Sequence, residues 1–382
     1  MRIGMFSNAY KPTVNGVVRS IDLFTQELRR LGHFVGIFAP DNYGYEDDEP
    51  FVFRYPALPL PSELDHSLPV LVAPQIDWLV PRLKLEIIHA HHPVVVGNAA
   101  LRFSRELGIP LVFTFHTLYH EYTHYFGFDT TLAKQIVKRI VAHFARKADQ
   151  IIVPSRAVAH IVTHDYGIDR PYEILPTPIA IDDYPPRPPE TLFQGPQIEL
   201  VYVGRVAREK NLDFLLRAFA HAFREDGRLR LRLVGGGPEL DSMRELAVTM
   251  GLGEVVSFVG KVPFARIPTE LAQADMFVFA SLTETQGLVV LEAMAAGLPM
   301  VLVDSPALLE HAHPDRDCLV APPQEEAFAA AILALVRDPD RGRALGAAAR
   351  RQAESLSVPV LTARLIAIYE DTIRRYSRRS RS

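Results

Sequence analysis

Short apolar runs alternate with amphipathic stretches along this whole 382-residue chain, and this alternation constrains the fold more than any other feature. The apolar runs lie at residues 2–6, 35–40, 87–93, 111–116 and 150–155, and again at 198–204, 230–237, 255–260, 276–281 and 299–304. Between the first two runs, residues 18–33 have helical periodicity and contain Gly32 as a C-terminal cap. Strands that alternate with helices predict parallel sheets with helices on both faces.

A proline-rich stretch without periodicity, residues 175–197, separates the two series of runs. We therefore predict an N-terminal domain at 1–180, a linker at 181–197, a second domain at 198–355, and a C-terminal helix with a basic tail at 356–382. Open α/β sheets bind ligands at the carboxyl ends of their strands. The expected fold is α/β, with two Rossmann-like, doubly wound domains that face each other across a ligand cleft.

Composition excludes several other classes of protein. The net charge of −4 gives no reason to expect a nucleic-acid partner, and nothing in the sequence indicates an obligate protein partner. The single cysteine, Cys318, excludes an internal disulfide framework, so a cytoplasmic location is expected. Residues 1–10 are typical of a first strand rather than a signal peptide. No run approaches the ~18 apolar residues of a membrane-spanning helix.

Two cations in the second half have the spacing of a phosphate clamp. Arg205 directly follows the run at 198–204, and Lys210 lies five residues later, at the expected start of a helix. Cationic side chains and the free N–H groups of a helix N-terminus converge on anions. Taken alone, this pattern is also compatible with two solvated side chains.

Two carboxylates farther along the chain have the spacing of a sugar-binding pair. Glu284 and Glu292 are separated by seven residues, with Gly287 between them. The glycine allows the backbone to approach a ligand closely, and residues 288–296 are predicted to form a helix. A carboxylate accepts two hydrogen bonds from sugar or ribose hydroxyls, so both glutamates are candidate ligand contacts.

Together, these motifs resemble those of the retaining glycosyltransferases of the GT-B fold, the large family with two glutamates in E-x7-E spacing. The similarity covers essentially the whole chain, and it implies that the C-terminal helix crosses back to the first domain. It implies that Arg205 and Lys210 hold the donor pyrophosphate, that Glu284 contacts the transferred sugar, and that Glu292 contacts the ribose. It also implies donor contacts from backbone segments at Gly16, Gly204, Gly236, Val262, Gly287, Leu288 and Val289.

One departure from the commonest family pattern narrows the subgroup. That pattern is E-G-F-G, whereas this chain has Glu284, Thr285, Gln286 and Gly287. The T-E-T-Q-G version looks like the subgroup that glycosylates diacylglycerol. Because Gln286 alters the expected sugar contact, the donor hexose stays open between glucose and another hexose.

The stretch HEYTH at 120–124 matches the H-E-x-x-H motif of zinc proteases. The third ligand of the longer motif is missing, because Thr130 occupies its position, and Gly127 interrupts any helix. The family resemblance instead places this stretch on the acceptor side, with Tyr119, His120 and Tyr122 as candidate contacts. A zinc site completed by a more distant residue and a plain surface loop remain alternatives.

The histidine that the resemblance implies at the reaction centre is His116. It is expected to emerge at the carboxyl end of the strand at 111–116 and to contact the donor sugar near the reacting carbon.

Three other groups of residues have spacings found in metal sites. His89, His91 and His92 are interpreted as the end of a strand, lining the cleft or capping the following helix. The D-x-D pairs at 315–317 and 338–340 do not directly follow a strand. Since Arg205, Lys210 and a helix N-terminus suffice to stabilise a leaving group, no metal or other cofactor is expected.

Residues 131–150 are predicted to form a basic amphipathic helix. Ile136, Val137, Ile140, Val141 and Phe144 are expected on one side, and the cations Lys134, Lys138, Arg139, Arg146 and Lys147 on the other. Such a helix is typical of a surface that docks on anionic lipid, with Lys134, Lys138 and Arg139 as contacts. An ordinary packed helix with a solvated basic face is the alternative.

The function predicted from these features is transfer of a hexose, expected to be α-linked glucose, from a nucleotide sugar such as UDP-glucose to a lipid such as diacylglycerol. The enzyme is expected to lie peripherally on the inner face of the cell membrane. GDP-mannose as donor, or a soluble sugar or sugar phosphate as acceptor, are rival enzyme functions. A non-catalytic nucleotide-sugar binder is a rival of another class. A dinucleotide-dependent oxidoreductase fits poorly, because Leu240 replaces the third glycine of G-x-G-x-x-G.

Overall fold

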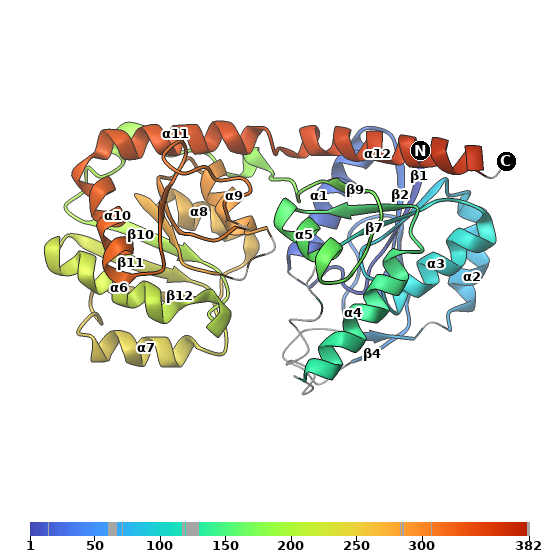
Figure 1. Ribbon diagram of the computed structural model, residues 1–382, viewed down its shortest axis with the longest axis horizontal. Coiled ribbons are helices and arrows are strands. Elements are labelled where there is room, and N and C mark those ends of the chain that lie inside the picture. The colour runs from blue at the N-terminus through green and yellow to red at the C-terminus, as the bar shows by residue number, and fades with distance from the viewer. Residues whose placement is uncertain are drawn as a thin grey trace. The chain divides into compact units, whose positions relative to one another are not determined.

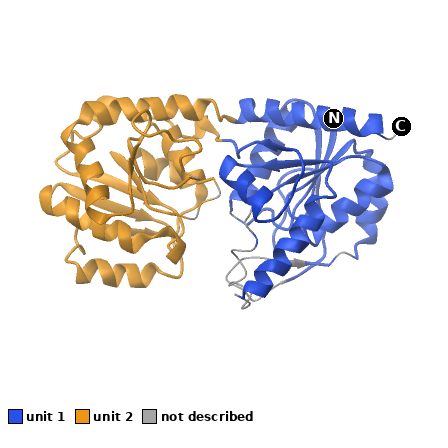
Figure 2. Cartoon of the chain, viewed as in Figure 1, with its two compact units in different colours: residues 1–178, 358–382 blue, residues 179–357 orange. Residues whose placement is uncertain are grey.

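The computed structural model describes residues 1–13, 15–59, 67–70, 72–116, 119, 130–282, 284, 286–306 and 308–379. The chain divides into two compact units (Figure 2). Unit 1 contains residues 1–178 and 358–382, and unit 2 contains residues 179–357. Each unit is built on one parallel sheet, as the alternation of runs predicted.

Within the described residues, the main sheet of unit 1 has seven strands in the order β3-β2-β1-β6-β7-β8-β9, all parallel. The strands are β1 (Arg2–Phe6), β2 (Phe34–Pro40), β3 (Val52–Tyr55), β6 (Ile87–Ala90), β7 (Leu111–Thr114), β8 (Gln150–Val153) and β9 (Tyr172–Ile174). A short antiparallel pair, β4 (Ala57–Pro59) and β5 (Ser67–Pro69), forms a separate sheet. The strand order reverses between β1 and β6, as it does in a Rossmann-like sheet.

Helices cover both faces of this sheet (Figure 1). They are α1 (Gly16–Arg30), α2 (Pro74–Leu79), α3 (Val96–Leu107), α4 (Thr131–Ala145), α5 (Arg156–His164) and α12 (Val358–Arg379). Alternate strand residues such as Phe6, Phe38 and Phe113 pack in one cluster with α3, α4 and α5. Helix α1 contacts α12 on the other face. The faces are distinct because successive side chains of a strand point to opposite sides of the sheet.

The C-terminal helix belongs to unit 1, as predicted. Leu361, Leu365 and Tyr369 are buried at helical spacing on α12. Arg375 donates a hydrogen bond of 2.6 Å to the side chain of Gln150, the first residue of β8. The last segment of the chain is therefore part of the core of the first unit, and it begins at Val358 rather than at residue 356.

Unit 2 repeats the same design. Its described strands are all parallel and have the order β12-β11-β10-β13-β14-β15. They are β10 (Ile198–Val203), β11 (Leu229–Val234), β12 (Val256–Gly260), β13 (Met276–Phe279), β14 (Met300–Val303) and β15 (Leu319–Ala321). The helices are α6 (Leu212–Glu225), α7 (Leu240–Thr249), α8 (Ile267–Ala272), α9 (Leu288–Ala295), α10 (Glu325–Arg337) and α11 (Pro339–Glu354). In chain order the strands lie 3-2-1-4-5-6, which is the order of dinucleotide-binding Rossmann sheets.

The proline-rich segment at 181–197 was expected to be a linker, but the structure places it within unit 2. The buried carboxylate of Asp275 accepts hydrogen bonds from the backbone N–H groups of Phe193 (3.0 Å) and Glu199 (2.9 Å). Its Oδ1 also lies 3.2 Å from the guanidinium of Arg187. The prediction failed because prolines remove backbone donors without preventing a segment from packing through its side chains.

We expect Asp275→Ala to lower the free energy of unfolding of unit 2 by about 3 kcal/mol, because it removes a buried carboxylate from two backbone donors and a cation. Urea unfolding followed by circular dichroism measures this loss. Fluorescence of Trp78, the single tryptophan, reports on unit 1. The urea concentration at the midpoint of the transition that it follows should not change.

The matched control is Asp241→Ala, because Asp241 pairs with Arg244 on the exposed surface of α7. Its loss should stay below about 1 kcal/mol. Equal losses in the two variants would show that Asp275 does not hold the proline-rich segment.

Candidate functional site

The carboxyl ends of β10 and β13 form the topological switch point of unit 2. These two strands are neighbours in the sheet, while their following segments lead to α6 and α9. Arg205 and Lys210 follow β10, and Glu284 follows β13. Ligands of open α/β sheets bind in the crevice at such a point. The fold thus brings Lys210 next to Glu284, which lies 74 positions farther along the chain.

Lys210 and Glu284 form an ion pair at this switch point. The Nζ atom of Lys210 lies 2.5 Å from Oε1 of Glu284, and both side chains are largely buried, with exposed fractions of 20% and 13%. Lys210 ends the short 3-10 helix η5 (Arg208–Lys210) that leads into α6. A charge-assisted hydrogen bond between partly buried groups fixes the orientation of both side chains.

The loops after β10 and β11 approach each other so closely that only glycine fits. A Cβ atom on Gly235 would lie 1.8 Å from the carbonyl oxygen of Gly204, and one on Gly237 would lie 2.2 Å from that of Val206. The N–H of Val206 donates to the carbonyl of Gly236 at 3.0 Å. The backbones of these two loops therefore pack directly against each other next to Arg205.

The loop after β12 packs against the loop after β11. A Cβ atom on Gly236 would lie 3.3 Å from Cβ of Lys261, the residue before the predicted donor contact Val262. Val262 itself is partly exposed. The predicted donor segments at Gly204, Gly236 and Val262 therefore lie in adjacent loops along one edge of the sheet.

Helix α9 begins beside Glu284. Gly287 precedes it with φ of +66°, and a Cβ atom there would lie 2.8 Å from Leu308, so the left-handed turn and the close packing both require glycine. Leu288 and Val289 are the first residues of α9, where amide N–H groups point out of the helix. Glu292 is buried one turn farther on.

Tyr202 supports this site, although the sequence analysis did not single it out. Its hydroxyl donates to the carbonyl oxygen of Arg205 at 2.9 Å, and its ring stacks on Phe279 of β13. Burial, together with the charges of Glu284 and Glu209, raises the pKa of Tyr202 well above its ordinary value. The available signal in the sequence was an aromatic residue two positions before Gly204, the glycine that follows β10.

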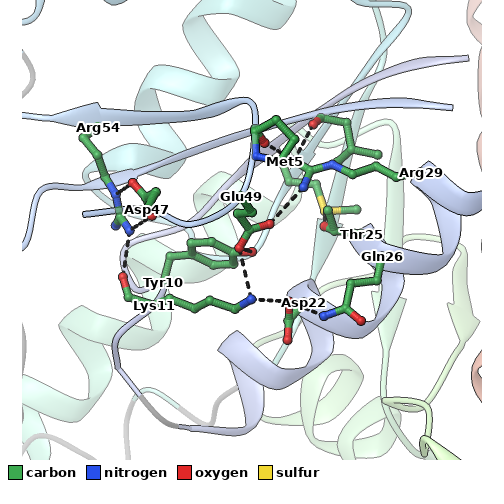
Figure 3. A network of polar contacts seen from close by, with 12 residues as sticks. Met5, Tyr10, Lys11, Asp22, Thr25, Gln26, Arg29, Asp47, Glu49 and Arg54 are labelled. Atoms are coloured by element: carbon green, nitrogen blue, oxygen red, sulfur yellow. Dashed lines mark hydrogen bonds and ion pairs between the residues drawn. The ribbon is translucent and has the colours of Figure 1, made fainter. Parts of the chain in front are cut away.

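In unit 1, the loop after β1 carries Gly16, the first residue of α1. Asn15 caps this helix, since its side chain accepts a hydrogen bond of 2.9 Å from the N–H of Val18. A network of polar contacts holds the loop against the segment between β2 and β3 (Figure 3). Helix α1 therefore begins after the carboxyl end of β1.

Glu49 is the centre of this network (Figure 3). Its carboxylate accepts from the hydroxyl of Tyr10 at 2.7 Å and pairs with Lys11 at 3.1 Å and Arg29 at 2.9 Å. Lys11 also pairs with Asp22 of α1 at 2.7 Å. Burial and the bond to Glu49 raise the pKa of Tyr10 well above its ordinary range, so Tyr10 acts as a donor.

The ends of β6 and β7 bring three histidines together. Nδ1 of His91 lies 2.9 Å from Nε2 of His116, and the ring of His89 lies 4.1 Å from that of His91. His89 is hydrogen-bonded through Nδ1 to Tyr369 of α12 and through Nε2 to Thr114, each at 2.6 Å. Burial lowers the pKa of His89 to about 3 and that of His116 to about 4. All these rings are therefore neutral near pH 7.

Comparison with known proteins assigns the family. A family profile described as "Glycosyl transferases group 1" matches residues 185–352, and one described as "Glycosyltransferase Family 4" matches residues 14–183. The chain is 31% identical over 321 residues to the alpha-monoglucosyldiacylglycerol synthase of Streptococcus pneumoniae, covering 81% of this chain and 72% of that protein. The chain belongs to the group 1 glycosyltransferases.

Two further relatives complete the comparison. The GDP-mannose-dependent alpha-mannosyltransferase of Mycolicibacterium smegmatis is 28% identical over 395 residues, with full coverage of both chains. The sucrose-phosphate synthase of Thermosynechococcus elongatus has a TM-score of 0.76 at 19% identity, over 97% of this chain and 99% of that chain. The glycosyltransferase therefore has the predicted GT-B fold, with two Rossmann-like domains.

Two of the three predicted acceptor contacts of the glycosyltransferase, His120 and Tyr122 of the HEYTH stretch, lie outside the described residues. Tyr119 is described, and its ring packs edge-on against Phe115 with centroids 6.1 Å apart. Its buried hydroxyl has no hydrogen-bond partner among the described residues.

Helix α4 differs from the predicted amphipathic pattern. Val141 and Phe144 are buried, but Ile136 and Ile140 are each 48% exposed, and Leu132 is 67% exposed. The helix therefore packs on one narrow apolar stripe and presents a second one outward. Lys138 lies 3.8 Å from Asp165, whereas Arg139 is exposed. Among the described residues, no helix has the length and hydropathy to cross a membrane.

The histidine run at 89–92 does not cap the following helix, contrary to one of its two interpretations. The side chain of Asn8 instead accepts from the N–H of Val96, the first residue of α3, at 3.0 Å. His92 accepts at Nδ1 from the N–H of Asn8 at 3.1 Å. The hydrogen bonds needed at this helix start come from the loop after β1, which is distant in sequence.

The two D-x-D pairs have structural contacts. Asp315 pairs with Arg341 at 2.7 Å, and the fully buried Asp317 bonds to His313 at 3.0 Å. Asp338 accepts from the N–H of Arg341 and caps α11. In the part of the chain that the structure describes, no three metal-ligating side chains come together in a way that would hold a metal ion.

We expect the free energy of unfolding of unit 1 to fall as the pH decreases from 7 to 5. Unfolded histidines bind protons near pH 6.5, whereas His89 and His116 stay neutral down to about pH 3 and 4, so protons favour the unfolded state. The contribution of His89 alone is about 2 kcal/mol at pH 5. The free energy of unfolding should therefore decrease less between pH 7 and pH 5 in His89→Gln than in the wild type, by about that amount. Urea unfolding followed by Trp78 fluorescence measures the difference.

The control for this measurement is Ile88→Val, which removes a buried methyl group from the same strand without changing a titratable group. A plot of its free energy of unfolding against pH should run parallel to that of the wild type. A His89→Gln curve that is also parallel would contradict the proposed neutrality of His89.

Proposed function

We propose that this glycosyltransferase transfers glucose from UDP-glucose to a lipid acceptor such as diacylglycerol, with retention at the anomeric carbon. The observation that carries the proposal is the 31% identity to an alpha-monoglucosyldiacylglycerol synthase over most of both chains. The T-E-T-Q-G motif at 283–287 supports the same subgroup. The Lys210–Glu284 pair at the switch point of unit 2 supplies suitable chemistry.

In the proposed reaction, the site stabilises the leaving nucleoside diphosphate rather than a covalent intermediate. Arg205, Lys210 and the first amides of α9 supply positive charge and hydrogen-bond donors to its phosphates. Glu284 accepts hydrogen bonds from the transferred sugar, and Glu292 accepts them from the ribose. Because these cations meet the developing charge, the reaction needs no metal.

The acceptor hydroxyl attacks on the face that the leaving group occupies. A phosphate oxygen of the departing UDP takes the proton of that hydroxyl, so the chain need not provide a general base. His116 is neutral at physiological pH, since burial lowers its pKa to about 4, and it acts as a hydrogen-bond partner of the sugar. Tyr119, whose ring packs against Phe115, is a candidate contact for the acceptor.

Helix α4 supports docking on the cytoplasmic face of a membrane. Its exposed side chains Leu132, Ile136 and Ile140 are apolar, and Arg139 lies next to them in sequence and is exposed. Apolar side chains that enter the acyl boundary and cations that attract anionic headgroups together bind a helix to a lipid surface. The lipid acceptor would then reach the enzyme from the membrane.

GDP-mannose is the second candidate donor. The relative named as a GDP-mannose-dependent alpha-mannosyltransferase is 28% identical and covers the whole of both chains. Gln286, which departs from the commonest family pattern, is buried and directly precedes Gly287, so the sugar contact expected from that pattern is changed.

The test is a screen of UDP-glucose, UDP-galactose and GDP-mannose against diacylglycerol, a soluble sugar and a sugar phosphate. Each pair is assayed with and without anionic vesicles, and with and without a chelator. The proposal predicts an α-linked glucosyl diacylglycerol from UDP-glucose, formed faster on anionic vesicles and at the same rate in the presence of the chelator. Mannosyl transfer, or transfer only to soluble acceptors, would overturn it.

We expect Lys210→Ala to reduce kcat for the donor identified in that screen by roughly 100- to 1000-fold, the usual effect of removing one donor to a developing oxyanion. The control is Arg217→Ala on α6, where a cation on the surface lies 3.9 Å from Glu325. Its kcat should match that of the wild type. Near-wild-type turnover of Lys210→Ala would remove Lys210 from the site.

A further inference from the structure

His91 and His116 come from the ends of two neighbouring strands and make one direct contact. Ala90 of β6 pairs with Phe113 of β7, so the residues just beyond both strands lie side by side. The contact joins Nδ1 of His91 to Nε2 of His116 at 2.9 Å, and the rings stack with centroids 5.2 Å apart. The N–H of His91 donates to the carbonyl of Phe6 at 2.8 Å, which anchors its backbone to β1.

Only one of the two nitrogen atoms in this contact carries a proton, because both rings are neutral. If His116 donated, the proton of His91 would be on Nε2, and a buried N–H would remain unpaired. The Nε2 atom of His91 is buried and has no hydrogen-bond partner among the described residues. An unpaired buried N–H is rarer and more costly than an unpaired acceptor.

The opposite arrangement avoids this cost. Here Nδ1–H of His91 donates to Nε2 of His116, and Nε2 of His91 is a bare acceptor. His116 must then carry its own proton on Nδ1. The hydrogen bond to His91 thereby determines which nitrogen of His116 offers a donor to other groups.

Among the residues that the structure describes, no charged side chain that would compete for this bond lines the cavity beside His91. A cavity of about 10 Å³ adjoins the rings of His91 and His116, and it is lined by uncharged side chains that include Ser20, Phe24, Ile152 and Leu365. On its other side, His91 lies against His89, which is held between Tyr369 and Thr114. His91 therefore has a fixed ring plane and one strong partner, His116.

We propose that His91 is a positioning residue for the reaction, which holds His116 as the Nδ1–H tautomer with its Nδ1 donor available to the sugar. This inference rests on the proposed function only in giving His116 a sugar contact. The tautomer itself is a property of the free protein. Hydrogen bonds of this kind orient a functional imidazole just as carboxylates and carbonyls orient metal-bound histidines.

The first test is kinetic and compares two substitutions of His91. His91→Asn keeps an N–H donor near the position of Nδ1, whereas His91→Leu removes it. We expect His91→Leu to lower kcat by about 10- to 100-fold with KM for the donor within about twofold, in line with the loss of an outer-shell partner. We expect His91→Asn to stay within about threefold of the wild type, because it restores the hydrogen bond.

The second test reads the tautomer directly and needs no substrate. Long-range 1H–15N correlation spectra of the full chain should show His116 protonated at Nδ1, with the resonance identified by its loss in His116→Asn. The same tautomer should persist in His91→Asn and become a mixture in His91→Leu. Circular dichroism and thermal unfolding verify that each variant is folded.

Tyr369→Phe is the matched control, since it removes the hydroxyl that bonds to His89 without touching His91. It should leave the tautomer of His116 unchanged. A wild-type His116 protonated at Nε2 would overturn the inference, as would equal kcat losses in His91→Asn and His91→Leu. If the donor screen fails but the spectra show the Nδ1–H tautomer, the proposed function is wrong and the hydrogen-bond assignment still holds.

Discussion

The reversal of strand order in each parallel sheet is the constraint on which the rest of the structure depends. In unit 2 it lies between β10 and β13, so the segments that follow these strands leave in opposite directions and open a crevice at their carboxyl ends. At that crevice, Nζ of Lys210 lies 2.5 Å from Oε1 of Glu284. In unit 1 the same reversal lies between β1 and β6, and the histidine cluster begins at the end of β6.

The two units present different chemistry at these edges. Unit 2 offers charge, with a cation and a carboxylate in contact beside the start of α9. Unit 1 offers neutral hydrogen-bonding groups, because burial lowers the pKa of His89, His91 and His116 far below physiological pH. In the reaction proposed above, only the phosphates of the leaving group need charge compensation, which is the chemistry of the edge of unit 2.

Much of the fold could be predicted because the relevant signals are local, and the candidate residues of unit 2 were chosen from equally local motif spacing. The strand runs at 2–6 and 198–204 correspond to β1 and β10, and the helix predicted at 288–296 corresponds to α9. The apolar runs did not predict β3, β9 and β15, which are short strands at the edges of their sheets, and the proline-rich segment was expected to be a linker. In each of these cases, packing against distant residues decided the outcome rather than local periodicity.

The sequence by itself determined the fold class, the family and the spacing of Arg205, Lys210, Glu284 and Glu292, because strand periodicity and motif spacing are properties of short segments. Only the tertiary structure decided that Lys210 contacts Glu284, and that Tyr369 reaches His89 from 280 positions away. It also decided that Ile136 and Ile140 of α4 are exposed. The physical reason is that hydrogen-bond pairing, desolvation and exposure depend on neighbours that the fold supplies and that no local pattern records.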